Sequence, residues 1–243
     1  MHRFHFNPHL IQDGLITLDK NQAHHAKKVL RLKPGEVVEL LDGQGGLFRG
    51  LVSSLENQSV SIKILNSINQ STSPVELSLA ASVIKPERME WMLEKSCELG
   101  VKEFIPILTQ RVVIHLSAER WKSKVQRWRR IAVESCKQCG QSLTPAIHEP
   151  ADYSNLIKDF KKFDLVLIPT LNQKSRFLKE ALESKKNAGK VLILIGPEGD
   201  FTGEESKEAI KAGAIPVSLG DLVMRAETAA IYTLSSVGFF FAK

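Results

Sequence analysis

The chain lacks long hydrophobic runs and any cysteine framework, and both absences exclude classes of protein. No apolar run approaches the ~20 residues that a transmembrane helix needs, and the N-terminal MHRFHFNPHL contains no secretory hydrophobic region. Three cysteines in 243 residues are too few for a network of disulfides, and their number is odd. We therefore expect a cytoplasmic protein that does not contact a membrane.

Nucleotide and metal motifs are also missing. There is no G-x-G-x-x-G after a strand and no G-x-x-x-x-G-K-[ST], so neither a Rossmann dinucleotide site nor a P-loop is indicated. Cys136 and Cys139 form a single pair on an apolar helical stripe, whereas a structural zinc site needs four ligands, so we interpret the pair as packing and expect no metal. Five histidines near the N-terminus have no carboxylate or cysteine at ligand spacing, and we expect them to face RNA or solvent: His2, His5, His9, His24 and His25.

Positive charge is present and unevenly distributed. The net charge is +6, yet residues 20–33 contain five Lys or Arg and no acid, and residues 111–141 contain eight against two acids. Such clusters suit a polyphosphate partner, because neutralising each phosphate releases counterions. A solvated helix face is the alternative for either cluster alone. The predicted RNA contacts are Lys27, Lys28, Arg31, Lys33, Arg111, Arg127, Arg130 and Lys137.

The pattern of elements changes near residue 72. Residues 37–41, 47–55 and 59–65 read as short strands separated by turn compositions, which predicts a small all-β unit over 1–72. The polar INQSTSP at 68–74 reads as a linker. Strands and helices then alternate, with strands at 76–83, 101–108 and 163–169 and helices at 86–100, 118–139 and 175–186, which predicts an α/β domain over 73–243.

Two strand-loop-helix units near the C-terminus indicate a binding site. The apolar strand at 191–195 runs into the loop 196–200, and Thr202 and Glu205 form a capping box for the next helix. The strand at 214–219 likewise runs into the loop 220–225 and a helix that begins near Glu227. Either loop alone could be an ordinary turn, but carboxyl ends of neighbouring parallel strands share one edge of a sheet. The pair therefore predicts one pocket.

Five segments carry a resemblance to a known family: VLRLKPGE at 29–36, MEWMLEKSCELGV at 89–101, CKQCG at 136–140, LILIGPEGDFTGEE at 192–205 and LGDLVMRAETAA at 219–230. Together they resemble the knotted SPOUT-type methyltransferases and, more narrowly, the RsmE family of small-subunit (16S) ribosomal RNA uridine N3-methyltransferases. The segments extend over nearly the whole chain, and the last two in tandem are highly specific.

The resemblance implies a PUA-like, RNA-binding β-barrel over 1–72 and a trefoil-knot methyltransferase domain over 73–243, with the knot within about 160–243. It also implies S-adenosyl-L-methionine as methyl donor, a uridine of 16S ribosomal RNA in the assembled 30S subunit as target, and a homodimer formed through the C-terminal helix. That helix carries six large apolar side chains, more than one core face requires: Tyr232, Leu234, Val237, Phe239, Phe240 and Phe241.

The expected donor site comprises the ends of three strands and the loops that follow, of which the first is implied by the resemblance alone: Pro169, Thr170, Leu194, Ile195, Gly196, Pro197, Glu198, Gly199, Leu219, Gly220, Val223, Met224 and Arg225. Arg225 is the expected electrostatic catalyst, because a guanidinium can stabilise the charge that forms on uracil O2 or O4 when N3 loses its proton. Alternatively, Arg225 pairs structurally with Glu198 or Glu227. These two carboxylates are the candidates for the general base.

The chain departs from the family pattern at two positions. Asp200 stands where the family usually has glycine, and Gln141 stands where it usually has an arginine that could grip a phosphate. Two alternative functions stay open: an RNA-binding or ribosome-assembly protein without catalysis, and a methyltransferase of the same superfamily that acts on transfer RNA ribose.

Overall fold

The computed structural model describes residues 1–56, 59–70, 73–112, 114, 116–171 and 175–242. It contains two compact units. The first comprises residues 1–72 and 133–144, and the second comprises residues 73–132 and 145–243. Residues 133–144 therefore pack with the N-terminal unit, although they lie within the stretch that the sequence assigns to the α/β domain.

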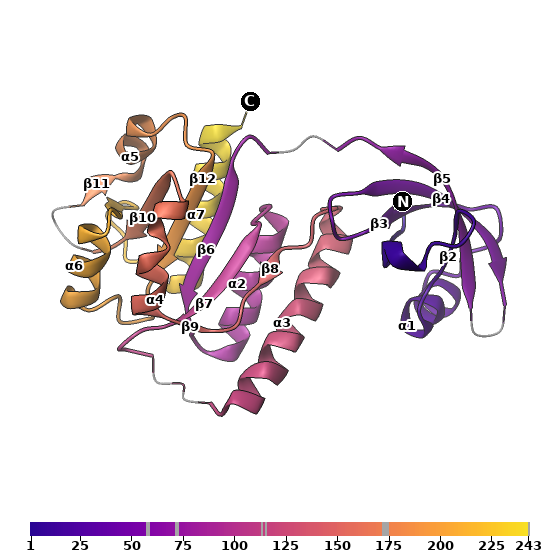
Figure 1. The fold of residues 1–243 in the computed structure, drawn as a ribbon, viewed down its shortest axis with the longest axis horizontal. Coiled ribbons are helices and arrows are strands. Elements are labelled where there is room, and N and C mark those ends of the chain that lie inside the picture. The colour runs from indigo at the N-terminus through magenta and orange to yellow at the C-terminus, as the bar shows by residue number, and fades with distance from the viewer. Residues whose placement is uncertain (57–58, 71–72, 113, 115, 172–174, 243) are drawn as a thin grey trace. The chain divides into compact units, whose positions relative to one another are not determined.

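The first unit is built on a five-stranded sheet in the order β1-β3-β4-β5-β2 (Figure 1). The strands are β1 (Arg3–His5), β2 (Leu15–Thr17), β3 (Val37–Leu41), β4 (Leu47–Leu55) and β5 (Val60–Ile68). β1 pairs with β3 in parallel, and the other pairs are antiparallel. The all-β prediction is thus confirmed, and two register shifts along β4 and β5 bend this sheet.

A short helical segment closes the core of this sheet. It consists of α1 (Lys20–His24) and a π-helical turn, η2 (His25–Val29), whose small side chains Ala23 and Ala26 are buried beside Phe4 and Ile16. The turn ends at Leu30, and Arg31 then adopts a left-handed conformation with φ 54°. A 3-10 turn, η1 (Pro8–Leu10), lies between β1 and β2.

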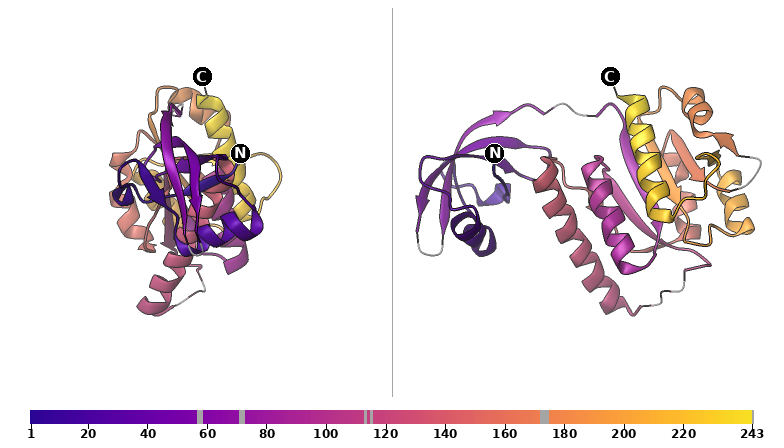
Figure 2. Two further views of the ribbon diagram at one scale, coloured as in Figure 1. Left: turned by 90° about the vertical axis from the view of Figure 1, so that its right-hand side faces the viewer. Right: turned by 180° about the vertical axis from the view of Figure 1, so that it is seen from behind.

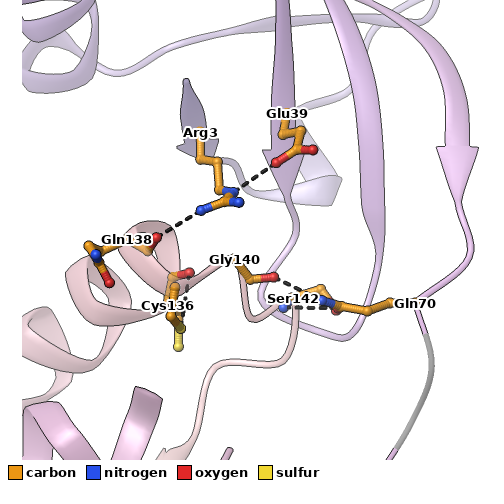
Figure 3. Close-up of polar contacts among 8 residues, drawn as sticks. Arg3, Glu39, Gln70, Cys136, Gln138, Gly140 and Ser142 are labelled. Atoms are coloured by element: carbon orange, nitrogen blue, oxygen red, sulfur yellow. Dashed lines mark hydrogen bonds and ion pairs between the residues drawn. The ribbon is translucent and has the colours of Figure 1, made fainter. Parts of the chain in front are cut away.

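The end of helix α3 (Ala118–Cys139) is capped by side chains of the first unit. Arg3 Nη1 donates to the carbonyl oxygen of Gln138 at 2.7 Å, and Gln70 Nε2 donates to that of Gly140 at 2.9 Å (Figure 3). Gly140 has φ 84° and donates to the carbonyl of Cys136, the geometry of a left-handed helix cap. Ser142 then donates to Gln70 at 2.5 Å. These contacts satisfy carbonyls that a free helix end leaves exposed, which accounts for residues 133–144 packing with this unit.

The second unit contains a parallel sheet in the order β11-β13-β10-β12-β6-β7-β8, with β9 also pairing with β7. All strand pairs in it are parallel. Its strands are β6 (Glu76–Ser82), β7 (Glu103–Leu108), β8 (Ala146–Ile147), β9 (Ala151–Asp152), β10 (Leu165–Pro169), β11 (Arg176–Phe177), β12 (Lys190–Ile195) and β13 (Ile215–Ser218). The central strands β6, β10 and β12 are almost wholly buried, as expected for a sheet covered on both faces.

Helices cover both faces of this sheet (Figures 1 and 2). On one face, α4 (Tyr153–Lys158), the turn η3 (Phe160–Lys162) and α6 (Gly203–Lys211) form a core with alternate residues of the strands, among them Leu192 and Leu194. On the other face, α7 (Ala226–Phe241) packs against β12, β6 and α2 (Pro86–Glu98). The predicted α/β class is therefore confirmed.

Three sequence expectations have different outcomes. The helix expected over 175–186 is wrong at its start, because Arg176–Phe177 forms β11 beside β13 and the helix, α5, covers only Leu178–Ser184. In α3, Cys136 is buried as expected, whereas Cys139 is exposed. The trefoil knot stays a prediction.

Within the described ranges, no helix is long and apolar enough to cross a bilayer.

Candidate donor-binding and catalytic site

A cavity of about 700 Å³ lies at the carboxyl ends of three neighbouring parallel strands. β10 ends at Pro169, β12 at Ile195 and β13 at Ser218, and each end contributes to the lining. The loops that follow these strands supply most of the remaining lining residues. The volume lies within the range of roughly 300–1,000 Å³ that is usual for cofactor-sized ligands.

The loop 196–200 is folded tightly and leaves no room for a side chain at its first position. A Cβ at Gly196 would lie 3.0 Å from the backbone nitrogen of Phe201 and 3.1 Å from Asp200 Oδ1. Asp200 has φ 61°, and its backbone N–H donates to the carbonyl of Pro197 at 2.9 Å. The position therefore has the left-handed backbone that favours glycine, and aspartate is one of the few other residues that tolerate it.

The Asp200 carboxylate also links two walls of the cavity. Its Oδ1 accepts the backbone N–H of Phe201 at 2.7 Å. Its Oδ2 lies 3.4 Å from both Thr170 Oγ1 and the backbone nitrogen of Leu171, in the loop after β10. Asp200 thus adds a polar connection between two loops and puts a carboxylate in the cavity lining.

The same loop is anchored from behind by Arg111 and by the start of α6. Arg111 donates to the carbonyls of Gly199 and Asp200. The predicted capping box is present, and the buried carboxylate of Glu205 accepts the backbone N–H groups of Thr202 and Gln110, each at 2.8 Å. Tyr153 donates its hydroxyl to the Glu205 carbonyl, and burial, with the nearby Glu205 and Glu208 carboxylates, raises the pKa of Tyr153 far above its usual range.

The third loop, residues 219–225, presents apolar side chains at the mouth of the cavity. Leu222 is 80% exposed and Val223 is 76% exposed, although both line the cavity. Gly220, with φ 118°, donates to Ser218 Oγ and allows the turn. Arg225 is exposed at the N-cap of α7, between the lining residues Met224 and Ala226.

The two candidate carboxylates share an arginine, and it is Arg88 of α2. Arg88 Nη1 lies 3.7 Å from Glu198 Oε1, and Arg88 Nε lies 3.8 Å from Glu227 Oε1. Glu198 lines the cavity with a side chain that is 45% exposed, whereas the Glu227 side chain is 12% exposed. The second Glu227 oxygen is buried without a hydrogen-bond partner among the described residues. Within the same ranges, Arg225 forms no ion pair with either glutamate.

Most of the expected donor-site residues line the cavity: Pro169, Thr170, Ile195, Gly196, Pro197, Glu198, Leu219, Gly220, Val223 and Met224. Leu194 does not, because it points into the core on the α6 side, and neither Gly199 nor Arg225 is among the lining residues. Sequence reasoning missed the apolar and polar rim formed by Leu171, Ser175, Phe177, Ser218, Asp221, Leu222, Ala226 and Ala229, as well as Asp200 as a lining residue. It also missed Arg88, although a charged residue in the first turn of a helix that follows a parallel strand was a usable signal.

The expected RNA contacts fall into two groups. Lys28, Arg31 and Lys33 are exposed and Lys27 is half-buried, and in the described part of the chain none of the four forms an ion pair. Of the four predicted contacts in the second cluster, three already have partners: Arg111 binds the carbonyls of Gly199 and Asp200, Arg127 binds both oxygens of Glu90 at 2.6 and 2.7 Å, and Lys137 binds Glu134 at 2.5 Å. Arg130 is exposed.

His5 is the histidine whose surroundings change its chemistry most clearly. Burial, followed by the nearby Lys137, lowers the pKa of His5, so this side chain is neutral at pH 7. The other four N-terminal histidines are exposed. Among the described residues, no three His, Cys, Asp or Glu side chains gather into a metal site.

Comparison with known proteins matches both units. Residues 71–238 match the family described as RNA methyltransferase domain, and residues 18–65 match the RNA methyltransferase PUA domain. The ribosomal RNA small subunit methyltransferase E of Mesomycoplasma hyopneumoniae is 30% identical over 235 residues, which cover 97% of this chain and 98% of that protein.

Two solved structures with bound S-adenosylmethionine are similar over almost the full length. Ribosomal RNA small subunit methyltransferase E from Neisseria gonorrhoeae gives a TM-score of 0.89 at 27% identity, covering 99% of this chain and 98% of the other. A methyltransferase from Legionella pneumophila gives 0.86 at 31% identity, with coverage of 97% and 96%.

Proposed function

The chain belongs to the RsmE family of small-subunit ribosomal RNA methyltransferases, and we propose that it transfers the methyl group of S-adenosylmethionine to N3 of one uridine in 16S ribosomal RNA. The observation that carries this proposal is the cavity of about 700 Å³ formed by the ends of β10, β12 and β13. Its position at the carboxyl edge of a parallel sheet is the usual place for a ligand in this class of fold.

The lining residues fit the proposed donor. Exposed backbone groups of the loops after β12 and β13 can hydrogen-bond adenine and ribose, and Gly196, which lines the cavity, lets its loop fold tightly there. Leu222 and Val223 provide apolar surface for the adenine ring. The carboxylates of Glu198 and Asp200 line the cavity, and their negative charge favours the binding of a cation there. S-adenosylmethionine, when bound, would supply a methyl group activated by its positive sulfonium, and its methyl–sulfur bond would break to leave neutral S-adenosylhomocysteine.

The protein's own residues must position the uracil ring and accept the proton that leaves N3. Uracil N3 must lose its proton before it can attack the methyl carbon, and negative charge then develops on O2 and O4. Arg225 is exposed beside the cavity and is free of ion pairs in the described ranges, so its guanidinium can stabilise that charge or grip a flanking phosphate.

Glu198 is better placed than Glu227 to accept the N3 proton. The Glu198 carboxylate lines the cavity and is partly exposed, so a uracil ring can reach it directly. The second oxygen of Glu227 is out of contact with solvent, so a substrate could reach it only if the surrounding side chains moved. We therefore assign the general base to Glu198.

The N-terminal PUA domain is proposed to hold the RNA through Lys27 and Lys28 of η2 and through Arg31 and Lys33, which follow it. A base must be unstacked before its ring nitrogen can be reached, and this costs least in single-stranded RNA held by a folded context. We accordingly propose the assembled 30S subunit, rather than naked RNA, as the substrate.

Mass analysis of ribosomal RNA nucleosides tests the proposed function directly. In a strain that lacks this protein, 16S ribosomal RNA should lose one 3-methyluridine, and a plasmid copy of the gene should restore it. Unchanged 3-methyluridine would support the non-catalytic RNA-binding alternative. Loss of a ribose-methylated nucleoside from transfer RNA would instead support the alternative that the protein methylates transfer RNA ribose.

We also propose a homodimer formed through α7. Leu234 and Val237 are fully buried in the unit, whereas Phe239 is 86% exposed and Tyr232 is 45% exposed, an apolar surface that a single chain leaves in water. Light scattering at micromolar concentration should give twice the chain mass, and Phe239→Glu should give the mass of one chain. Leu65→Glu, at an exposed apolar position in the first unit, is the matched control and should stay dimeric. A monomeric wild-type protein would contradict the proposal.

A further inference from the structure

We propose that Arg88 is a positioning residue of the methyl-transfer site, which holds Glu198 in the orientation needed to take the uracil proton. The inference rests on the proposed function. Arg88 lies in the first turn of α2, more than a hundred residues from both of its partners, and it does not itself line the cavity.

One guanidinium faces two carboxylates through two different nitrogens. Nε lies 3.8 Å from a Glu227 oxygen, and Nη1 lies 3.7 Å from a Glu198 oxygen. Both distances are longer than a hydrogen bond, so the arginine is held between the two acids without being fixed to either. A planar fork can do this, whereas a lysine ammonium is a single point charge on a flexible stem.

Burial distinguishes the two ends of this contact. The Glu227 side chain is 12% exposed and sits in the first turn of α7, a helix whose inner side is packed in the core. The Glu198 side chain is 45% exposed and belongs to the loop 196–200. Glu227 is therefore the fixed anchor, and Glu198 is the movable partner that Arg88 draws toward α2 and α7.

The second Glu227 oxygen is buried and has no hydrogen-bond partner among the described residues. A movement of Arg88 toward Glu227 would shorten the 3.8 Å distance between Nε and Oε1 to that of a hydrogen bond. Hydrogen bonds of this kind are often long before substrate binds and shorten in the reactive complex. The same movement would reorient Glu198 at the cavity, because both carboxylates share the one guanidinium.

The test compares single-turnover methylation of unmodified 30S subunits at saturating donor. Arg88→Ala should lower the rate by about 10², the effect of misplacing a reacting group by about 1 Å, while donor affinity, measured by calorimetry, stays within about threefold of wild type. Arg88→Lys, which keeps the charge but not the fork, should lose roughly tenfold. Lys95→Ala is the matched control, because Lys95 lies on the same helix between Glu94 and Glu98 and outside the cavity lining, and it should react at the wild-type rate.

A double-mutant cycle shows whether Arg88 acts through Glu198. In a Glu198→Gln background, Arg88→Ala should change the rate by less than about threefold, because the group that it orients has been removed. A merely structural role would instead lower the rate by the full factor in both backgrounds. That result would overturn the proposal, as would wild-type turnover by Arg88→Ala or Arg88→Lys. If Arg88→Ala does not fold, the same rates are compared for Arg88→Lys in the wild-type and Glu198→Gln backgrounds. An inactive wild-type protein would refute the proposed function itself.

Discussion

Arg225→Ala should slow methyl transfer by roughly 10²–10³, the loss seen when one preorganised group that stabilises a developing anion is removed. Arg225 is exposed at the N-cap of α7 beside the cavity, and within the described residues no carboxylate neutralises it. Its positive charge is therefore available to the uracil ring or to a phosphate beside it. Single-turnover rates on unmodified 30S subunits measure the effect, with donor affinity expected to stay near the wild-type value.

Arg176→Ala is the matched control for this prediction. Arg176 is also an exposed arginine flanked by two residues that line the cavity, Ser175 and Phe177, and it is not itself a lining residue. Its replacement should leave the rate within about twofold. A wild-type rate for Arg225→Ala would remove Arg225 from the mechanism, and an equal loss for both variants would show that positive charge near the cavity, rather than Arg225 in particular, supports the reaction.

Removing the positive charges of Lys27, Lys28, Arg31 and Lys33 should weaken RNA binding by a factor similar to the rate loss expected for Arg225→Ala. The combined variant is Lys27→Glu, Lys28→Glu, Lys33→Glu and Arg31→Gly, with glycine chosen because Arg31 has φ 54°. For single-stranded RNA, each phosphate contact contributes roughly 0.7 to the slope of log affinity against log salt. Four lost contacts should flatten that slope by about 3 and lower affinity at 0.1 M salt by on the order of 10²–10³.

Binding of 16S ribosomal RNA across a salt series checks this result, and donor affinity should be unchanged. Arg127→Ala serves as the control, because both oxygens of Glu90 already occupy its guanidinium, and it should alter the slope little. If the four-residue variant bound RNA with the wild-type slope, this surface would not be the site that contacts phosphate.

Local patterns in the sequence were enough to predict most elements of the fold. The strands Val37–Leu41 and Leu47–Leu55 and the helix Ala118–Cys139 have the bounds expected from periodicity and turn residues. The capping box of Thr202 and Glu205 is equally local, because its two partners are three residues apart. The types of the two domains, however, were recognised through the family resemblance, which periodicity alone does not supply.

Contacts between distant segments could not be predicted in this way. Arg88 meets Glu198 and Glu227 only because α2 and α7 cover the same face of the sheet, and nothing in the local sequence of α2 specifies those partners. Arg111 illustrates the same difficulty. Its place in a basic cluster predicts an RNA contact, which stays a prediction, but gave no sign that the fold brings it to the carbonyls of Gly199 and Asp200. Charge density along the chain cannot tell a free cation from one that the fold has already paired.

The capping of α3 by the first unit has a consequence for the order in which the nascent protein matures. Residues 1–72 are synthesised first, but their unit also contains residues 133–144, the last of which is added 72 residues later. At typical translation rates that delay is roughly 4 to 14 seconds. During it, Arg3 and Gln70 have no helix end to bind. The N-terminal unit thus completes its packing only after the first strands of the catalytic unit, β6 and β7, have been made.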